Sequence, residues 1–347
     1  MTARHESLPV ALLYTGGTFG MVPSERGYTP SHDLPERVER QVSGLRAAGM
    51  PAVAWLDART GPPRNSADAD PAFWYRLADT IRAAAASYRG FVIIHGTDTL
   101  AFTGAALSFL LADIERPVIV TGARAPLGEP GSDAGDNLLG AVRAAAAPLD
   151  RAEVGILAGD RLLRANRTTK RHGDLEQAFT SPGCEPLARV AAGVEPRAGA
   201  GRELPHEAPP AGPFAPAGVR VGMLPVFPGI DGAMVRALVA TGLQGLVLEA
   251  YPAAVGPGGD ADLVAALAEA RAAGVVIGAV SQARLGRIRF GRYAAGTPLA
   301  DAGVVGGADM TREAALTKLH YLLAAGLAPT AAADAFARNL RGELTPE

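Results

Sequence analysis

Cysteine and lysine are scarce in this sequence. Cys184 is the single cysteine among 347 residues, which excludes an internal disulfide and a metal centre built from several cysteines. We interpret it as a small buried hydrophobe or an inert surface thiol. Lys170 and Lys318 are the two lysines, so almost all of the basic residues are arginines. Because a lysine gives up its proton more readily than an arginine, Lys170, which lies in a polar motif, is a candidate base.

The sequence also lacks clustered basic charge and long apolar runs. The formal net charge is −2, and Lys and Arg cluster over no more than a few residues, so the footprint of nucleic-acid binding is missing. No window reaches the ~18 apolar residues of a membrane span. The first residues, MTARHESLPVALLY, hold only a short apolar stretch without a small-residue cleavage site. We therefore expect a cytoplasmic protein that acts on a small molecule.

What the sequence has in quantity is apolar residues, at 48% of the chain. A chain of this length can bury two cores, which favours two domains. Apolar runs of strand length recur between helical patterns, at residues 10–14, 91–94, 117–120, 154–157, 221–227, 246–248 and 275–280. This alternation predicts an α/β fold with mostly parallel strands that are buried on both faces. Amphipathic helices are predicted at residues 33–48 and 311–325, the second capped by Asp309 or Thr311.

A stretch rich in Pro, Gly and Ala divides the chain. Residues 195–218, EPRAGAGRELPHEAPPAGPFAPAG, show neither a helical nor a strand period. We predict a linker at residues 201–217. It would separate an N-terminal catalytic domain at residues 1–200 from a C-terminal α/β domain at residues 218–347.

Two of the predicted strands end in loops of glycine and threonine. YTGGTFG at residues 14–20 ends one strand, and HGTDTL at residues 95–100 ends another. Since open α/β sheets bind ligands at the carboxyl ends of their strands, Thr18 and Thr97 are expected in one crevice. Neither loop is a G-x-G-x-x-G, and the sequence contains no P-loop motif. The pattern instead indicates acyl transfer, with a threonine hydroxyl as nucleophile and backbone N–H groups around the oxyanion.

A threonine nucleophile needs a proton acceptor. None is adjacent to Thr18, although Tyr28 lies ten residues further on. The segment RANRTTKRHGD supplies Lys170, and a lysine that is buried among apolar groups has a lowered pKa and can act as a base. Thr97, Asp98 and Lys170 therefore form a predicted set of nucleophile, orienting group and base. Which threonine attacks first stays open.

Five motifs occur in one order along the chain, TGGTFG, HGTDTL, VTGARAP, NRTTK and GVVGGADMTREAALTKLHYLL. Through these motifs the chain resembles the bacterial L-asparaginases, closest to the cytoplasmic type I group, nearly end to end. The resemblance implies a larger N-terminal domain with a mostly parallel sheet and a smaller C-terminal parallel α/β domain. It also implies hydrolysis of L-asparagine to L-aspartate and ammonia through an acyl-enzyme. A homodimer or homotetramer is implied as well, with no cofactor and no metal.

The resemblance assigns roles to the threonines and their neighbours. Thr18 matches the usual nucleophile of the family, and Tyr28 matches the tyrosine that assists it. Thr97, Asp98 and Lys170 match a second triad, in which the threonine positions or activates water. Thr97 and Asp98 are also expected to contact the substrate, with Asp98 at its α-amino group.

Two further positions are implied in substrate binding. Ser66, in RNSADAD, matches the serine that binds the α-carboxylate. Ala123 matches the position whose backbone carbonyl contacts the departing amide.

Other functions stay open on the sequence. Ala67 stands where many relatives carry a second polar residue that binds substrate, which leaves room for a broader amidohydrolase acting on glutamine or D-asparagine. A non-catalytic amino-acid sensor could use the same crevice, although binding alone does not require both hydroxyls and the lysine. A related fold serves archaeal amidotransferase subunits that act on charged tRNA, and the slightly negative net charge counts against that function.

For His95 we expect a structural role, because the six histidines are scattered.

Overall fold

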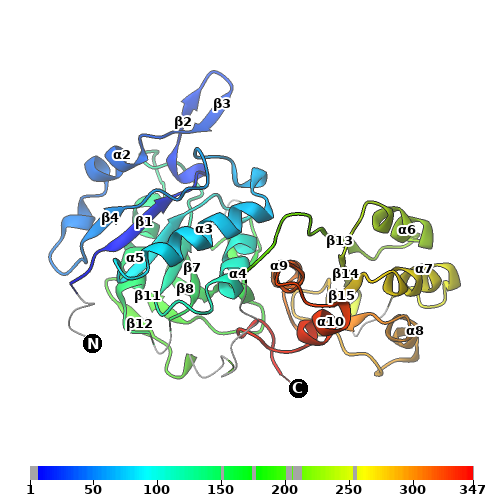
Figure 1. Cartoon of the computed structure of the whole chain (residues 1–347). Helices are drawn as coiled ribbons and strands as arrows, with labels where there is room; N and C mark the ends of the chain where they lie inside the picture. The colour runs from blue at the N-terminus through cyan, green and yellow to red at the C-terminus, as the bar shows by residue number, and fades with distance from the viewer. Residues whose placement is uncertain are drawn as a thin grey trace. The chain divides into compact units, whose positions relative to one another are not determined.

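The chain folds into two α/β units (Figure 1). The computed structural model describes residues 7–149, 152–173, 177–200, 205, 213–252 and 256–346. Contacts divide the chain into Met1–Glu203 and Leu204–Glu347. The predicted linker at residues 201–217 lies mostly outside the described residues, which include only 205 and 213–217 of it.

The N-terminal unit is built on an eight-stranded sheet in the order β12-β11-β8-β7-β6-β5-β1-β4. Neighbouring strands from β4 to β7 are parallel, whereas the pairs from β7 to β12 are antiparallel. The strands of the sheet are β1 (Val10–Tyr14), β4 (Val53–Trp55), β5 (Gly90–Ile94), β6 (Val118–Thr121), β7 (Val154–Ala158), β8 (Arg161–Arg164), β11 (Ala188–Val190) and β12 (Val194–Pro196). Two small hairpins lie outside it, β2 (Met21–Ser24) with β3 (Gly27–Pro30) and β9 (Thr169–Lys170) with β10 (Phe179–Thr180).

Helices cover both faces of this sheet. They are α2 (Leu34–Gln41), α3 (Pro71–Ala84), α4 (Leu100–Leu110) and α5 (Ala134–Ala146), with single 3-10 turns η1 (Thr18–Gly20), η2 (Ser43–Arg46), η3 (Ser66–Asp68) and η4 (Ala165–Arg167). Gly104 of α4 packs against Ile156, and Gly140 of α5 packs against Leu157. Because successive residues of a strand point to opposite faces, α4 and α5 lie on opposite faces of β7. This explains why the parallel strands are unbroken apolar runs.

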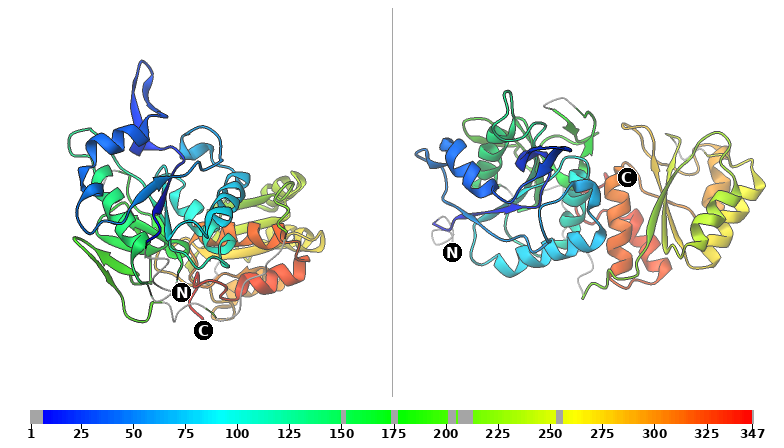
Figure 2. Two further views of the ribbon diagram at one scale, coloured as in Figure 1. Left: turned by 60° about the vertical axis from the view of Figure 1, so that its left-hand side comes forward. Right: turned by 90° about the horizontal axis from the view of Figure 1, so that it is seen from above.

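The C-terminal unit holds a four-stranded sheet in which all neighbours are parallel. Its strands are β13 (Val221–Pro225), β14 (Gly245–Ala250), β15 (Val276–Ser281) and β16 (Val305–Gly306), and its helices are α6 (Gly232–Ala240), α7 (Ala261–Ala272), α8 (Thr297–Asp301), α9 (Arg312–Ala324) and α10 (Pro329–Ala337), with η7 (Ala294–Gly296). Leu319 of α9 packs at Gly245, and Phe336 of α10 packs at Gly278. Helices α9 and α10 cover one face of the sheet and α6 and α7 the other (Figure 2). The predicted fold class, a larger mostly parallel sheet and a smaller parallel one, is confirmed.

The two predicted helices fared differently. The single helix predicted over residues 33–48 was too long, since α2 ends at Gln41 and η2 follows. The interruption lies beside Gly44, a residue that weakens helices and that here packs closely against Leu139. Helix α9 agrees with the prediction to within one residue at each end. It is capped by Thr311, whose hydroxyl accepts from Ala314 N at 3.1 Å.

The helices were compared with the length and hydropathy that a membrane span needs. Among the described residues, none of them is both long enough and apolar enough to span a bilayer.

Candidate active site

Three loops meet at the carboxyl edge of the N-terminal sheet. They follow β1, β5 and β6, which are adjacent and parallel. Thr15 N donates to Ile94 O at 3.0 Å, and His95 N donates to Thr121 O at 2.8 Å. The loop with Thr18, the loop with Thr97 and the loop with Ala123 therefore lie in a row at one end of the sheet, where open α/β sheets bind their ligands.

The glycines of YTGGTFG let these loops touch. Gly17 has φ +82°, and a Cβ on it would lie 2.2 Å from Gly96 Cα. Gly16 has φ +118°, and its Cβ would lie 2.0 Å from Arg64 O. At both positions the close approach is to backbone of the protein itself, and it requires glycine. Thr18 begins η1 directly after this contact and is half-buried.

Lys170 joins the second loop from β9. Its Nζ donates to Thr97 Oγ1 at 2.9 Å and to Asp98 Oδ1 at 2.6 Å. The side chain of Lys170 is 23% exposed and that of Asp98 is 64% exposed. The expected burial among apolar groups is therefore not what surrounds Lys170, because its ammonium contacts a hydroxyl and a carboxylate near solvent. A direct Thr97–Lys170 hydrogen bond provides a path for proton exchange between the two side chains.

The hydroxyl of Tyr28 is hydrogen-bonded to a residue other than Thr18. This tyrosine belongs to the β2–β3 hairpin, which projects from the unit (Figure 1), and its side chain is 51% exposed. Its hydroxyl donates to Glu129 Oε1 at 3.0 Å, and this hydrogen bond raises the pKa of Tyr28. In the described part of the chain, the hydrogen-bond partner of Tyr28 is thus Glu129 rather than Thr18.

Ser66 and Ala123 lie beside the Thr97 loop. Ser66 begins η3 and is buried, and its carbonyl accepts from Thr99 Oγ1 at 2.7 Å. A Cβ on Gly96 would lie 2.6 Å from Ser66 Oγ, so this serine packs directly on the loop. Ala123 is 2% exposed and lines a small cavity together with Thr97.

Two residues that the sequence analysis did not identify hold the Ala123 loop. The carboxylate of Asp133 accepts from Arg124 N at 2.9 Å and from Ala125 N at 3.3 Å. Asn137 Nδ2 donates to Gly122 O at 3.0 Å and to Asp133 Oδ2 at 3.0 Å. The backbone on both sides of Ala123 is therefore fixed. In the sequence, Asp133 is an ordinary helix cap, yet it makes no cap hydrogen bond to α5.

A third such residue, Arg37 of α2, holds the loop that contains Thr18. This arginine is buried, and its guanidinium donates to Gly20 O at 3.0 Å and to Leu127 O at 2.6 Å. Leu127 N in turn donates to Phe19 O at 2.9 Å. The end of η1 is thereby tied both to α2 and to the segment that carries Glu129. In the sequence, Arg37 could have been noticed because it lies between the apolar residues Leu34 and Val38 of an amphipathic helix.

His95 serves the fold. Its ring lies between Gly96 O at 2.8 Å and Thr103 Oγ1 at 3.1 Å, and it meets Phe73 edge-on. Burial lowers its pKa to about 4, so the ring is neutral at neutral pH. Among the described residues, no three His, Cys, Asp or Glu side chains are grouped so that they could hold a metal ion.

Comparison with known proteins places these features in a wider context. The family model for the N-terminal domain of asparaginase matches residues 9–199, and the model for the C-terminal domain of glutaminase/asparaginase matches residues 220–336. The chain is 40% identical to L-asparaginase 1 of Escherichia coli (strain K12) over 348 residues, covering 97% of this chain and 98% of that protein. It is 36% identical to the human 60 kDa lysophospholipase, covering 96% of this chain and 61% of that one. The crystal structure of L-asparaginase I from Vibrio cholerae O1 biovar eltor superposes with a TM-score of 0.83 at 33% identity, covering 98% of this chain and 99% of that chain.

Proposed function

The chain belongs to the asparaginase family, and from this premise we propose that it hydrolyses L-asparagine to L-aspartate and ammonia through a threonine ester. The observation that carries the proposal is the contact of Lys170 Nζ with Thr97 Oγ1 and Asp98 Oδ1. Gly96, which directly precedes Thr97, packs against Gly17, which directly precedes Thr18. Two hydroxyls and one ammonium at a strand-end crevice suit acyl transfer.

In the first step, Thr18 Oγ1 attacks the side-chain carbonyl carbon of asparagine. The new C–O bond forms while the carbonyl π electrons move onto oxygen, and collapse of this tetrahedral intermediate then breaks the C–N bond. Ammonia leaves with the proton that the hydroxyl gave up. Backbone N–H groups of the glycine loops are suited to stabilise the oxyanion of the tetrahedral intermediate. The carbonyl of Ala123 accepts a hydrogen bond from the departing amide, and Asp133 and Asn137 hold that carbonyl in place.

In the second step, water attacks the β-aspartyl ester. Thr97 orients this water, and Lys170 exchanges a proton with it through the Thr97 hydroxyl. The α-amino group of the substrate pairs with Asp98, and its α-carboxylate binds Ser66. The C–O bond to Thr18 then breaks, releasing L-aspartate and the free hydroxyl.

Tyr28 takes part only if its hydroxyl changes partner. We assign it to assist Thr18 when the β2–β3 hairpin moves over the bound substrate, with Glu129 as its partner in the absence of substrate. The raised pKa of Tyr28 in its present contact keeps the hydroxyl protonated and able to donate.

Ammonia release tests the proposal. The native protein, Thr18→Ala and Thr97→Val are assayed with L-asparagine, L-glutamine and D-asparagine. We expect release from L-asparagine by the native protein, and loss of about 10²-fold or more in each variant. If the native protein releases ammonia from none of the three amides, the assigned reaction is wrong. If Thr18→Ala keeps full activity, the assigned nucleophile is wrong.

The same assay, extended to further substrates, measures how broad the substrate range is. The C-terminal family model includes glutaminases in its description, which favours L-glutamine as the second substrate to examine. An acyl ester is assayed as a further substrate, because one relative is named a lysophospholipase. Comparable kcat/KM values for L-glutamine and L-asparagine would replace the asparaginase assignment with a broader amidohydrolase.

We also propose that the protein works in the cytoplasm as a homo-oligomer. The family resemblance supports both statements. Sedimentation of the purified full chain tests the assembly, and cell fractionation tests the location.

A further inference from the structure

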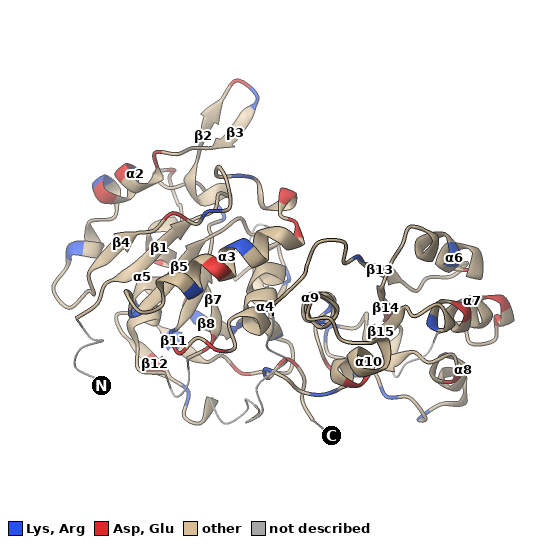
Figure 3. Cartoon of the chain, viewed as in Figure 1, with Lys and Arg blue, Asp and Glu red and all other residues tan. Residues whose placement is uncertain are grey.

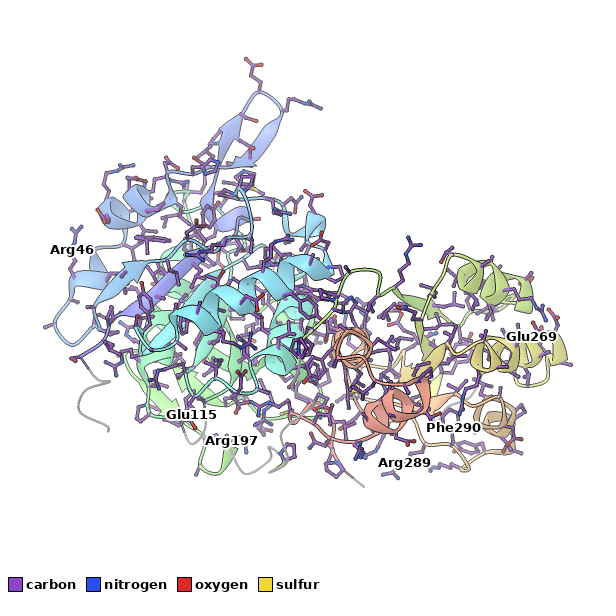
Figure 4. All side chains as sticks on the ribbon, viewed as in Figure 1. Arg46, Glu115, Arg197, Glu269, Arg289 and Phe290 are labelled. Carbon is purple, nitrogen blue, oxygen red and sulfur yellow. The ribbon has the colours of Figure 1, made fainter. Side chains whose placement is uncertain are left out.

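A hollow lined by arginines lies within the C-terminal unit. It has a volume of about 1180 Å³ and lies between the segment that follows β15 and the segment that follows α10. Four arginines line it, Arg287, Arg289, Arg292 and Arg338, and none of the described residues that line it is Asp or Glu. The arginines between β15 and α8 are coloured blue in Figure 3, and Figure 4 labels Arg289 and Phe290 on this segment.

The walls of the hollow are fixed by hydrogen bonds. Ile288 N donates to Ala308 O at 2.9 Å, and the guanidinium of Arg287 donates to Thr345 O. Thr345 in turn donates from N to Asp309 Oδ1 at 2.8 Å and from Oγ1 to Asp309 Oδ2 at 2.6 Å. The two segments therefore hold their arginines in a prearranged shape, which reduces the ordering cost of binding a ligand.

Nearby carboxylates have other partners. Asp309 accepts both hydrogen bonds of Thr345, and Glu343 is bound to Lys318 Nζ at 2.6 Å. The Nε of Arg287 is buried and has no acceptor among the residues that the structure describes. The formal net charge of the protein is −2, so a local concentration of positive charge sets this hollow apart from the average of the chain and favours anions there.

The chemistry of the lining indicates the class of ligand. A guanidinium presents two parallel N–H groups that match the oxygens of a phosphate, and several arginines together suit adjacent phosphates. Small-molecule sites commonly have volumes of ~300–1,000 Å³, so the hollow has room for a nucleotide. Phe290 adds apolar surface beside the charges. We propose that this hollow is a binding site for small molecules that carry two or more linked phosphates, such as nucleoside diphosphates and triphosphates.

Calorimetric titration of the full-length protein tests the site. The probes are inorganic triphosphate and ATP, each without metal and at constant ionic strength, up to about 1 mM. We expect one site per chain and a dissociation constant that rises about tenfold or more in the double variant Arg292→Gln/Arg338→Gln. Tighter binding of ATP than of triphosphate indicates that the base contacts Phe290, and equal binding assigns the site to the phosphates alone.

The matched control removes two arginines of the same unit that do not line the hollow. The variant Arg220→Gln/Arg271→Gln loses the same charge, so it should bind as the native protein does. No binding of either probe to the native protein overturns the proposal. Equal weakening in both double variants also overturns it, because the effect would then be general charge. If Arg292→Gln/Arg338→Gln does not fold, by circular dichroism, the single variant Arg292→Gln decides by the same comparison with Arg220→Gln.

Discussion

The two lysines of this chain form ion pairs of equal length in opposite surroundings. Lys170 Nζ lies 2.6 Å from Asp98 Oδ1, with side chains that are 23% and 64% exposed. Lys318 Nζ lies 2.6 Å from Glu343 Oε1, with both side chains fully buried. The distance between the charges is therefore the same at the two lysines, and what differs is the exposure of their side chains to solvent.

Lys318 has used all of its donors inside the C-terminal unit. Its ammonium donates to Phe336 O at 2.8 Å, to Arg338 O and to Glu343. Glu343 also accepts from Leu340 N at 2.9 Å and from Arg341 N at 2.6 Å. Burial lowers the pKa of Lys318, and Glu343 opposes that change. This cluster fastens the chain after α10 onto α9. Among the described residues, Lys170 donates to Thr97 and Asp98, which leaves one of its three N–H groups for another acceptor.

The largest expected effect comes from Lys170→Met. It removes the group that we propose to exchange a proton with Thr97, so kcat should fall about 10²–10⁴-fold. The free energy of unfolding should change by less than about 1 kcal/mol, because Asp98 is exposed and stays hydrated. Steady-state ammonia release and urea unfolding measure the two quantities. Near-native kcat in this variant would remove the distinction between the two lysines.

Lys318→Met should show the reverse pattern. It leaves the carboxylate of Glu343 buried without its cation, which should cost about 3–5 kcal/mol in the free energy of unfolding. The rate per folded molecule should stay near native, because Lys318 does not belong to the proposed site. Urea unfolding gives the first value, and ammonia release normalised to folded protein gives the second. The double variant Lys318→Met/Glu343→Gln should recover part of the loss; no recovery would mean that the pair is not the source of the cost.

Each unit also carries a buried histidine, and both should make stability depend on pH. Burial lowers the pKa of His95 and of His320 to about 4. Between about pH 6.5 and pH 4 the unfolded chain binds protons that the folded chain excludes, so stability falls as the pH falls. The loss should be on the order of 2 kcal/mol per histidine by pH 4.5.

Unfolding curves at pH 7 and pH 4.5 check this expectation. His320→Gln should lose less stability than the native protein over this interval, since it lacks one of the two groups. Identical losses in the two proteins would show that His320 does not titrate as its burial implies.

The smallest effect concerns the hairpin of the N-terminal unit. Glu129→Gln removes the carboxylate that raises the pKa of Tyr28, so this pKa should return toward its ordinary value of about 10. Ultraviolet titration of the tyrosines measures it, with Tyr28→Phe identifying the signal. No change of the titration in Glu129→Gln would place the Tyr28 hydroxyl elsewhere in solution.

Much of the fold could be predicted because local patterns set it. Strands β1, β5 and β7 are covered by helices on both faces, so their consecutive residues are all apolar and can be recognised in the sequence. The end of α2 could not be placed in the same way. Its apolar period continues past Gln41, and the close packing of Gly44 on Leu139, far along the chain, interrupts it.

Some residues of the candidate site could also be predicted from local sequence patterns, and others could not. The loops after two buried strands singled out Thr18, Thr97 and Asp98, and Lys170 drew attention as one of the two lysines of the sequence. Arg37 and Asp133 escaped notice because each bonds to the backbone of another segment, Arg37 to carbonyls and Asp133 to N–H groups. Every residue carries such backbone groups, so the sequence does not mark the partners. The Tyr28–Glu129 hydrogen bond joins residues 101 positions apart, beyond the reach of any local pattern.

By itself, the sequence determined the alternation of strands and helices, the glycine and threonine loops at the strand ends, and the family. Only the tertiary structure decided what each charged group does there. It buried Lys318 among the carbonyls after α10 and left Lys170 beside solvent, although both are lysines in motifs of the same family. The physical reason is that exposure and partners are set by packing between distant segments, whereas periodicity records only how each segment packs on its own.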